Sequence, residues 1–218
     1  MTIKATSVLA ILAIWGAMIP AVVLRHGSWW ALIFAVLATG SIGLNARRRL
    51  GLSRVLALGG IWAGTAAAAA TDSDTAWMAV FAFITTGAVV MSRMKRDALF
   101  QGAVIAGIWA VVGAVAARDS GATWVCVFAF LSTLALANSR SAQRALVAAV
   151  AWGAGGGVML ATGGFTWLAP IAFFVTAFLF RRGPFSLPRR FEWDLFDRDE
   201  KEDDTIEGRW RSVHDAER

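Results

Sequence analysis

Few residues in this chain are of types that carry out catalysis or bind metal, and they are scattered. The two histidines, His26 and His214, stand far apart, and Cys126 is the only cysteine. A zinc site needs several His or Cys ligands at short spacings, and a disulfide needs a second cysteine. The sequence therefore predicts no metal centre and no internal disulfide, and Cys126 is expected to be a small buried apolar residue.

The acidic residues between apolar segments are equally isolated. Asp72, Asp74 and Asp119 fall in short predicted turns without His or Cys nearby, so we interpret them as solvated turn charges. The chain has no GxGxxG or GxxxxGK[ST] phosphate loop and no G-x-S-x-G nucleophile elbow. We expect no enzymatic activity, and an enzyme acting on lipid is the least favoured alternative.

The residues that do recur at regular spacing are tryptophans and threonines. Successive members of two tryptophan series are 47, 47 and 43 residues apart, and the second series follows the first by 15 residues. The first series is Trp15, Trp62, Trp109 and Trp152. The second series is Trp30, Trp77, Trp124 and Trp167. Four residues after each second-series tryptophan are Phe34, Phe81, Phe128 and Ile171. Five residues after it are Ala35, Ala82, Ala129 and Ala172. Nine residues after it are Thr39, Thr86, Thr133 and Thr176.

Two interpretations of these tryptophans and threonines remain open at this stage. A buried indole N–H needs an acceptor, so a contact from each first-series Trp to a Thr hydroxyl, within or between hairpins, would satisfy the indole and fix the register of two helices. Alternatively, the four Trp and four Thr face a shared axis and line a pore, or hold an apolar ligand such as a pigment, quinone or lipid. No other cofactor is predicted. The second-series tryptophans suit a membrane–water interface.

The elements that carry these residues are long apolar segments. The chain of 218 residues is 57% hydrophobic and 17% charged, with a mean hydropathy of +0.59. Its apolar blocks are 7–24, 29–46, 54–71, 75–92, 99–117, 122–138, 145–161 and 165–180. Blocks of this length and composition predict transmembrane helices, because in hydrocarbon a segment must satisfy its own backbone hydrogen bonds.

The charges between the blocks predict an orientation. Residues 1–180 carry 12 basic and 4 acidic residues, and alternate connections hold nine basic residues against two. This pattern is typical of the positive-inside rule rather than of a nucleic-acid surface, so we expect both termini in the cytoplasm and no nucleic-acid partner.

The recurring tryptophans predict four tandem helical hairpins. Their approximate bounds are 5–50, 51–97, 98–144 and 145–182. Each unit crosses twice, so all enter the membrane in the same direction and are related by an axis along the membrane normal. The sequence thus predicts an all-α, polytopic integral membrane protein with a transmembrane domain of eight helices over residues 1–180, and it leaves open whether the hairpins close into a ring.

Residues 181–218 differ in composition from the apolar segments that precede them. Basic and aromatic residues are followed by an acidic run, which is typical of a juxtamembrane segment and a flexible tail. The apolar residues that could dock a partner there are Trp193, Phe196, Ile206 and Trp210.

These features favour a non-enzymatic membrane component, a scaffold or accessory subunit of a larger complex. Its expected partners are the lipid bilayer and other membrane or cytoplasmic proteins, the latter reached through the tail. The alternative is a channel, carrier or binder for a neutral or apolar ligand, lined by the repeated Trp and Thr. Composition rich in Ala and Arg suggests a bacterial cytoplasmic (inner) membrane.

Overall fold

The computed structural model describes residues 5–24, 29–45, 50–92, 94, 98–139 and 141–178. The chain divides into two compact units, Met1–Arg181 and Arg182–Arg218, and the second unit lies outside the described residues. Within the described ranges the structure is all-helical, and each of the eight predicted apolar blocks contains one α-helix.

Four longer helices alternate with four shorter ones. The longer helices are α1 (Ala5–Leu24), α3 (Leu52–Thr71), α5 (Leu99–Arg118) and α7 (Ala142–Thr162). The shorter helices are α2 (Ala31–Leu44), α4 (Met78–Met91), α6 (Val125–Ala137) and α8 (Leu168–Phe178). The 3-10 helices η1 (Ser73–Trp77) and η2 (Ser120–Trp124) run directly into α4 and α6.

Six helical segments are long and apolar enough to cross a membrane. A helix of 20 residues, such as α3 or α5, is about 30 Å long at 1.5 Å per residue, which matches the hydrocarbon layer. The six segments are Ala5–Val23, Leu52–Thr71, Asp74–Met91, Leu99–Arg118, Ser120–Ala137 and Ala142–Thr162. The structure therefore has the character of a membrane protein.

The tight turns within the hairpins are formed by residues of known turn chemistry. The Asp72 side chain accepts a hydrogen bond from the Asp74 backbone N–H at 3.0 Å, and Asp119 accepts one from Gly121 at 3.0 Å. Each aspartate therefore caps the start of a 3-10 helix, a more specific role than the solvated charge expected from the sequence. In the last hairpin Gly163 ends α7 with a φ of +68°, a backbone conformation that glycine adopts without strain.

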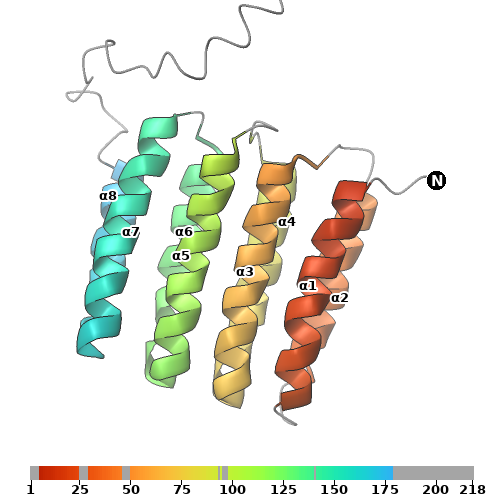
Figure 1. Cartoon of the computed structure of the whole chain (residues 1–218), viewed down its shortest axis with the longest axis horizontal. Helices are drawn as coiled ribbons and strands as arrows, with labels where there is room; N and C mark the ends of the chain where they lie inside the picture. The colour runs from red at the N-terminus through yellow and green to blue at the C-terminus, as the bar shows by residue number, and fades with distance from the viewer. Residues whose placement is uncertain are drawn as a thin grey trace, which may run out of the picture. The chain divides into compact units, whose positions relative to one another are not determined.

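The hairpins pack in chain order as two rows of helices. In one row α1 packs on α3, α3 on α5 and α5 on α7, and in the other α2 packs on α4, α4 on α6 and α6 on α8. Figure 1 shows the first row in front of the second, with α1 and α7 at opposite ends. The sequence leaves open whether the hairpins close into a ring, which would bring the first hairpin against the last. The principal contacts instead join neighbours along a row.

The closest approach is between α3 and α5, where backbone meets backbone. A Cβ added at Gly64 would lie 2.1 Å from the Trp109 carbonyl oxygen, and one at Gly113 would lie 2.3 Å from the Gly64 carbonyl oxygen. A Cβ at Gly60 would lie 2.3 Å from Ala106. Only glycine fits at these positions, because any side chain would separate the two helices.

The junctions between the longer helices share one register. Gly113 of α5 packs on Gly64 of α3, and Gly156 of α7 packs on Val111 of α5. In both pairs the glycine is four residues after the first-series Trp of its helix, and its partner is two residues after the Trp of the preceding long helix. At three before and four after the Trp, α3, α5 and α7 carry only Gly or Ala. In α1 these places hold Leu12 and Ile19, which are 60% and 51% exposed. The flank of α1 that has no neighbour in the row is therefore bulky where the packed flanks are small.

Candidate functional site

Three first-series tryptophans bond to the threonine of their own hairpin. Trp15 Nε1 donates to Thr39 Oγ1 at 3.0 Å. Trp62 Nε1 donates to Thr86 Oγ1 at 3.0 Å, and Trp109 Nε1 donates to Thr133 Oγ1 at 3.1 Å. This confirms the predicted Trp–Thr contact in three hairpins. In each of them the bond joins the middle of the longer helix to the shorter one.

The threonines complete a chain of hydrogen bonds. Thr86 Oγ1 donates in turn to the Ala82 carbonyl oxygen at 2.8 Å, and Thr133 Oγ1 donates to the Ala129 carbonyl oxygen at 2.8 Å. Because each hydroxyl both accepts and donates, a polar group in the helix interior is satisfied without water. The alanine four residues before each threonine is buried, which leaves space for the indole of the facing helix.

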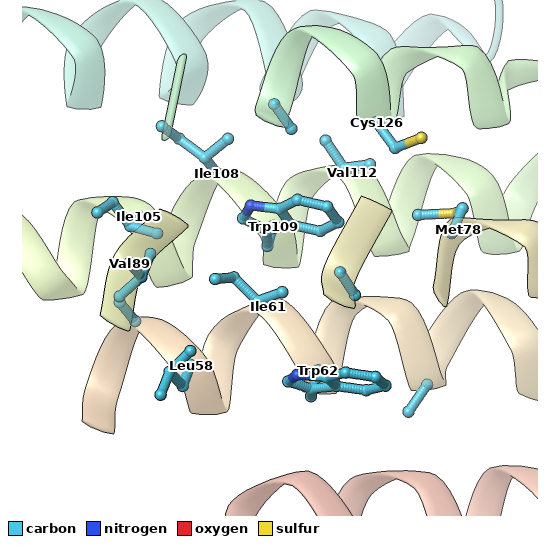
Figure 2. Close-up of a cluster of buried hydrophobic side chains, with 14 of the residues drawn as sticks. Leu58, Ile61, Trp62, Met78, Val89, Ile105, Ile108, Trp109, Val112 and Cys126 are labelled. Atoms are coloured by element: carbon cyan, nitrogen blue, oxygen red, sulfur yellow. The ribbon is translucent and has the colours of Figure 1, made fainter. Parts of the chain in front are cut away.

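The inner indoles lie wholly within the packed helices. Trp62 and Trp109 have no exposed surface, and Figure 2 shows both among aliphatic side chains such as Ile61 and Ile108. Trp15, in the first hairpin, is half-buried. The Trp–Thr pair of the first hairpin is thus less buried than the pairs of the two inner hairpins.

The fourth hairpin departs from the pattern. Trp152 Nε1 donates to Ser132 Oγ at 3.1 Å, in the preceding hairpin, and not to Thr176. Thr176 is fully buried, and its hydroxyl donates to the Ala172 carbonyl oxygen at 2.8 Å. The predicted threonine acceptor, within or between hairpins, is therefore wrong for Trp152, because a serine of α6 supplies the acceptor.

Each indole of the first series thus has its own hydroxyl acceptor, and the four are spread along a row of helices. The tryptophans proposed for a pore or ligand site thus each have a separate hydrogen-bond partner. What this arrangement does chemically is to fix the register of helices through buried hydrogen bonds.

The second-series tryptophans contact the phenylalanine four residues later. The ring centroids of Trp30 and Phe34 are 5.9 Å apart, and those of Trp77 and Phe81 are 5.4 Å apart, both edge to face. This spacing places both rings on one side of a helix. Trp77 Nε1 also donates to Thr123 Oγ1 of the next hairpin at 3.2 Å. Trp167, which has Ile171 four residues later, lies against Phe165 instead.

Phenylalanines connect neighbouring hairpins in the same row. Phe34 lies 6.1 Å from Phe83, and Phe81 lies 6.0 Å from Phe130, measured between ring centroids. Phe128 lies 6.0 Å from Phe173. One inter-hairpin aromatic contact is thus made three times along the shorter helices.

Sequence reasoning missed a polar contact at the other end of the inner hairpins. Arg54, in the first turn of α3, donates from Nη2 to the carbonyl oxygens of Ser92 at 2.8 Å and Met94 at 3.0 Å. Gln101, in the first turn of α5, donates from Nε2 to the carbonyl oxygens of Leu136 and of Ser139, the latter at 3.1 Å. Both satisfy carbonyl groups at the end of the shorter helix.

The signal for this contact is positional. Arg54 and Gln101 both stand eight residues before the first-series Trp, where the outer hairpins have Ser7 and Arg144. Only Arg54 and Arg144 share a residue type, so comparing identities between the four hairpins does not reveal the position. In the sequence Arg54 is only one of the nine basic residues that predict the orientation.

The remaining candidate residues are Cys126, the possible metal ligands and the docking residues of the tail. Cys126 is buried with no exposed surface, as expected. Among the described residues no group of three or more His, Cys, Asp or Glu side chains comes together. His26, His214 and the predicted docking residues of the tail lie outside the described ranges; the docking residues are Trp193, Phe196, Ile206 and Trp210.

Comparison with known protein families, with curated proteins and with solved structures found no match to this chain.

Proposed function

We propose that this protein is a non-enzymatic membrane component that acts as a scaffold or accessory subunit of a larger membrane complex. The observation that carries the proposal is the outer face of α3 and α5. When the first five residues and the last residue of each helix are set aside, every exposed residue of α3 and α5 is glycine or alanine. These residues are Ala63, Ala67, Gly107, Ala110 and Ala114.

The row of shorter helices has a different outer face. Its exposed large residues include Val36 and Leu37 of α2, Ile84 of α4, and Ile171 and Phe174 of α8. In membranes, small residues allow another helix to approach closely, and bulky aliphatic side chains suit contact with lipid chains. This contrast supports a helix of a partner protein against α3 and α5, and lipid against the shorter helices.

The alternative function, a channel or carrier for a neutral or apolar ligand, would need the Trp and Thr side chains to share one space. Their separate hydrogen bonds favour the scaffold.

The proposal includes eight crossings by four tandem repeats. The α2 and α8 helices have only 14 and 11 residues, but α4 also has 14 and becomes long enough through η1 before it. We propose that α2 and α8 likewise cross together with flanking residues. The recurring Trp–Thr and Phe–Phe contacts support a common origin of the four units.

We further propose that the protein lies in a bacterial cytoplasmic membrane with both termini inside, on the strength of the basic residues in alternate connections. Its tail is then positioned to bind a cytoplasmic partner. Reporter fusions at residues 50, 73, 97, 120, 142 and 163 test this topology. Cytoplasmic signals are expected at 50, 97 and 142 only, and a cytoplasmic signal at 73 or 120 would contradict it.

A photo-reactive residue at Ala110 tests the scaffold proposal, with Ile84 as the matched control on the other face. The Ala110 probe should capture one discrete protein in cells, and the Ile84 probe should capture lipid. In unlabelled protein, Ala110→Leu should abolish co-purification of that protein, whereas Ile84→Ala should not. Lipid adducts alone at both sites would refute the proposal.

A further inference from the structure

Two buried hydroxyl groups stand on the helices beside the last-hairpin indole, and the indole uses the one that belongs to the preceding hairpin. Trp152 donates to Ser132, 20 residues earlier, whereas the other three indoles donate to a threonine 24 residues later. The threonine 24 residues after Trp152 is Thr176, which is present and fully buried. The sequence of the repeat thus keeps an acceptor that the indole leaves unused.

The acceptor that is used belongs to a helix that already serves another hairpin. Ser132 and Thr133 are adjacent in α6 and both fully buried, and they accept from Trp152 and Trp109 respectively. The hydroxyl at the place of Ser132 is not general to the repeat, because the corresponding residues are Ala38, Thr85 and Val175. Ser132 therefore joins the third hairpin to the fourth.

Thr176 has the geometry of a threonine that receives an indole. Its hydroxyl donates to the carbonyl oxygen four residues earlier at 2.8 Å, as do Thr86 and Thr133. In those two residues the oxygen lone pairs then accept from tryptophan. The donor side of Thr176 is thus arranged in the same way, and its oxygen can accept an indole.

The helix that carries Trp152 is less covered by protein than the inner long helices: 28% of an 18-residue window is buried in α7, against 56% in α3 and in α5. A Cβ added at Gly153 or Gly157 would meet nothing within 4 Å, and one at Gly155 would meet only Leu168 at 3.9 Å. Its contact with α5 is made through a side chain, Val111 against Gly156, and not through backbone as between α3 and α5. A small rotation or shift of α7 would therefore disturb fewer protein contacts than the same movement of α3 or α5.

We propose that Trp152 is a two-position latch. In the position described here it donates to Ser132 and fastens the fourth hairpin to the third. In the other it donates to Thr176, which closes the fourth hairpin on itself and frees it to move from the third. Since the indole N–H is bonded in both positions, neither state leaves a buried donor unsatisfied, which would cost about a factor of ten or more in stability.

Disulfide formation between α5 and α7 reports the docked state. In full-length protein in lipid nanodiscs with Cys126→Ala, the pair Val111→Cys and Gly156→Cys is suitable, because a Cβ at Gly156 lies 3.3 Å from the Val111 Cβ. The matched control is Ala13→Cys with Gly59→Cys across α1 and α3, where the corresponding distance is 3.6 Å.

The latch predicts a specific set of results. Ser132→Ala should slow disulfide formation of the α5–α7 pair several-fold and leave the α1–α3 pair unchanged. Thr176→Val should affect neither pair. The two substitutions together should lower the equilibrium constant for folding about tenfold more than the product of their separate effects, because the indole then has no acceptor.

Three results would overturn the proposal. The first is unchanged α5–α7 disulfide formation in Ser132→Ala. The second is strictly additive effects of the two substitutions on stability, which would mean that Thr176 never accepts the indole. The third is unfolding of Ser132→Ala alone to the same extent as the double variant.

Discussion

The two inner hairpins differ from the two outer ones in how much of each helix is covered by protein. In an 18-residue window, 56% of residues are buried in α3 and in α5, against 28% in α1 and in α7. The tryptophan series is common to all four, so the difference does not come from the hydrogen bond itself. It comes from the neighbours on each flank, and it indicates that one hairpin sequence can serve in the centre of a row or at its end.

The largest effect is expected from removing a central indole. Trp109→Ala should destabilise the protein by about 3–5 kcal/mol, because a fully buried large side chain and its hydrogen bond are lost. Trp15→Ala should cost roughly half as much, since Trp15 is half-buried. Reversible unfolding in mixed detergent micelles measures both. Equal losses would refute the difference between inner and outer hairpins.

The next effect concerns glycine. Gly113→Val should cost about 1–3 kcal/mol or more by forcing α3 and α5 apart, since the added atoms would meet the Gly64 carbonyl. Gly157→Val, in an outer helix, should change stability by less than about 0.5 kcal/mol, because nothing lies near it. The same unfolding measurement applies. A large loss at Gly157 would show that α7 is packed more closely than the structure has it.

The third largest loss of stability is expected from removing the polar contact at the ends of the inner hairpins. Gln101→Leu removes the donor to the Leu136 and Ser139 carbonyl groups and should cost about 1–2 kcal/mol. Gln143→Leu, at an exposed position in α7, is the matched outer variant and should be neutral. Hydrogen exchange at the end of α6 should rise in the first variant only. Exchange that stays unchanged there would remove the role given to Gln101.

The smallest effect is expected from the threonine alone. Thr86→Val should cost about 0.6 kcal/mol and at most about 1.7 kcal/mol, the range of single side-chain hydrogen bonds in membrane proteins. Thr39→Val should cost no more than this, because the bond lies in a half-buried pair. A double-mutant cycle of Trp62→Phe with Thr86→Val isolates the bond. A coupling energy of zero would mean that packing alone fixes the register.

The residues that could be predicted from the sequence are those whose partners lie in the same repeat. Trp62 and Thr86 are 24 residues apart in the middle of two predicted helices, so a tight hairpin brings them together. The partner of Trp152 could not be predicted in the same way, because it is set by Ser132 in another hairpin. The row arrangement was not predictable either, since hairpins of one sequence pattern can pack along a line or around an axis.

The hydrogen bonds of side chains at the ends of helices are even harder to predict from the sequence. Arg54 and Gln101 both donate hydrogen bonds to carbonyl oxygens near the end of a shorter helix, but Arg54 does so from a guanidinium and Gln101 from an amide. Asp72 and Asp119 were seen as turn residues, but their hydrogen bonds depend on a 3-10 helix that apolar periodicity does not reveal.

The bulky pair Leu12 and Ile19 has a consequence for how such a protein can grow. A duplicated unit inserted between the second and third hairpins would find small-residue surfaces on both sides and could be accommodated. A unit added ahead of the first would face two branched side chains where its backbone needs to come near, and would stay apart. A further hairpin could thus pack closely between the second and third hairpins but not ahead of α1.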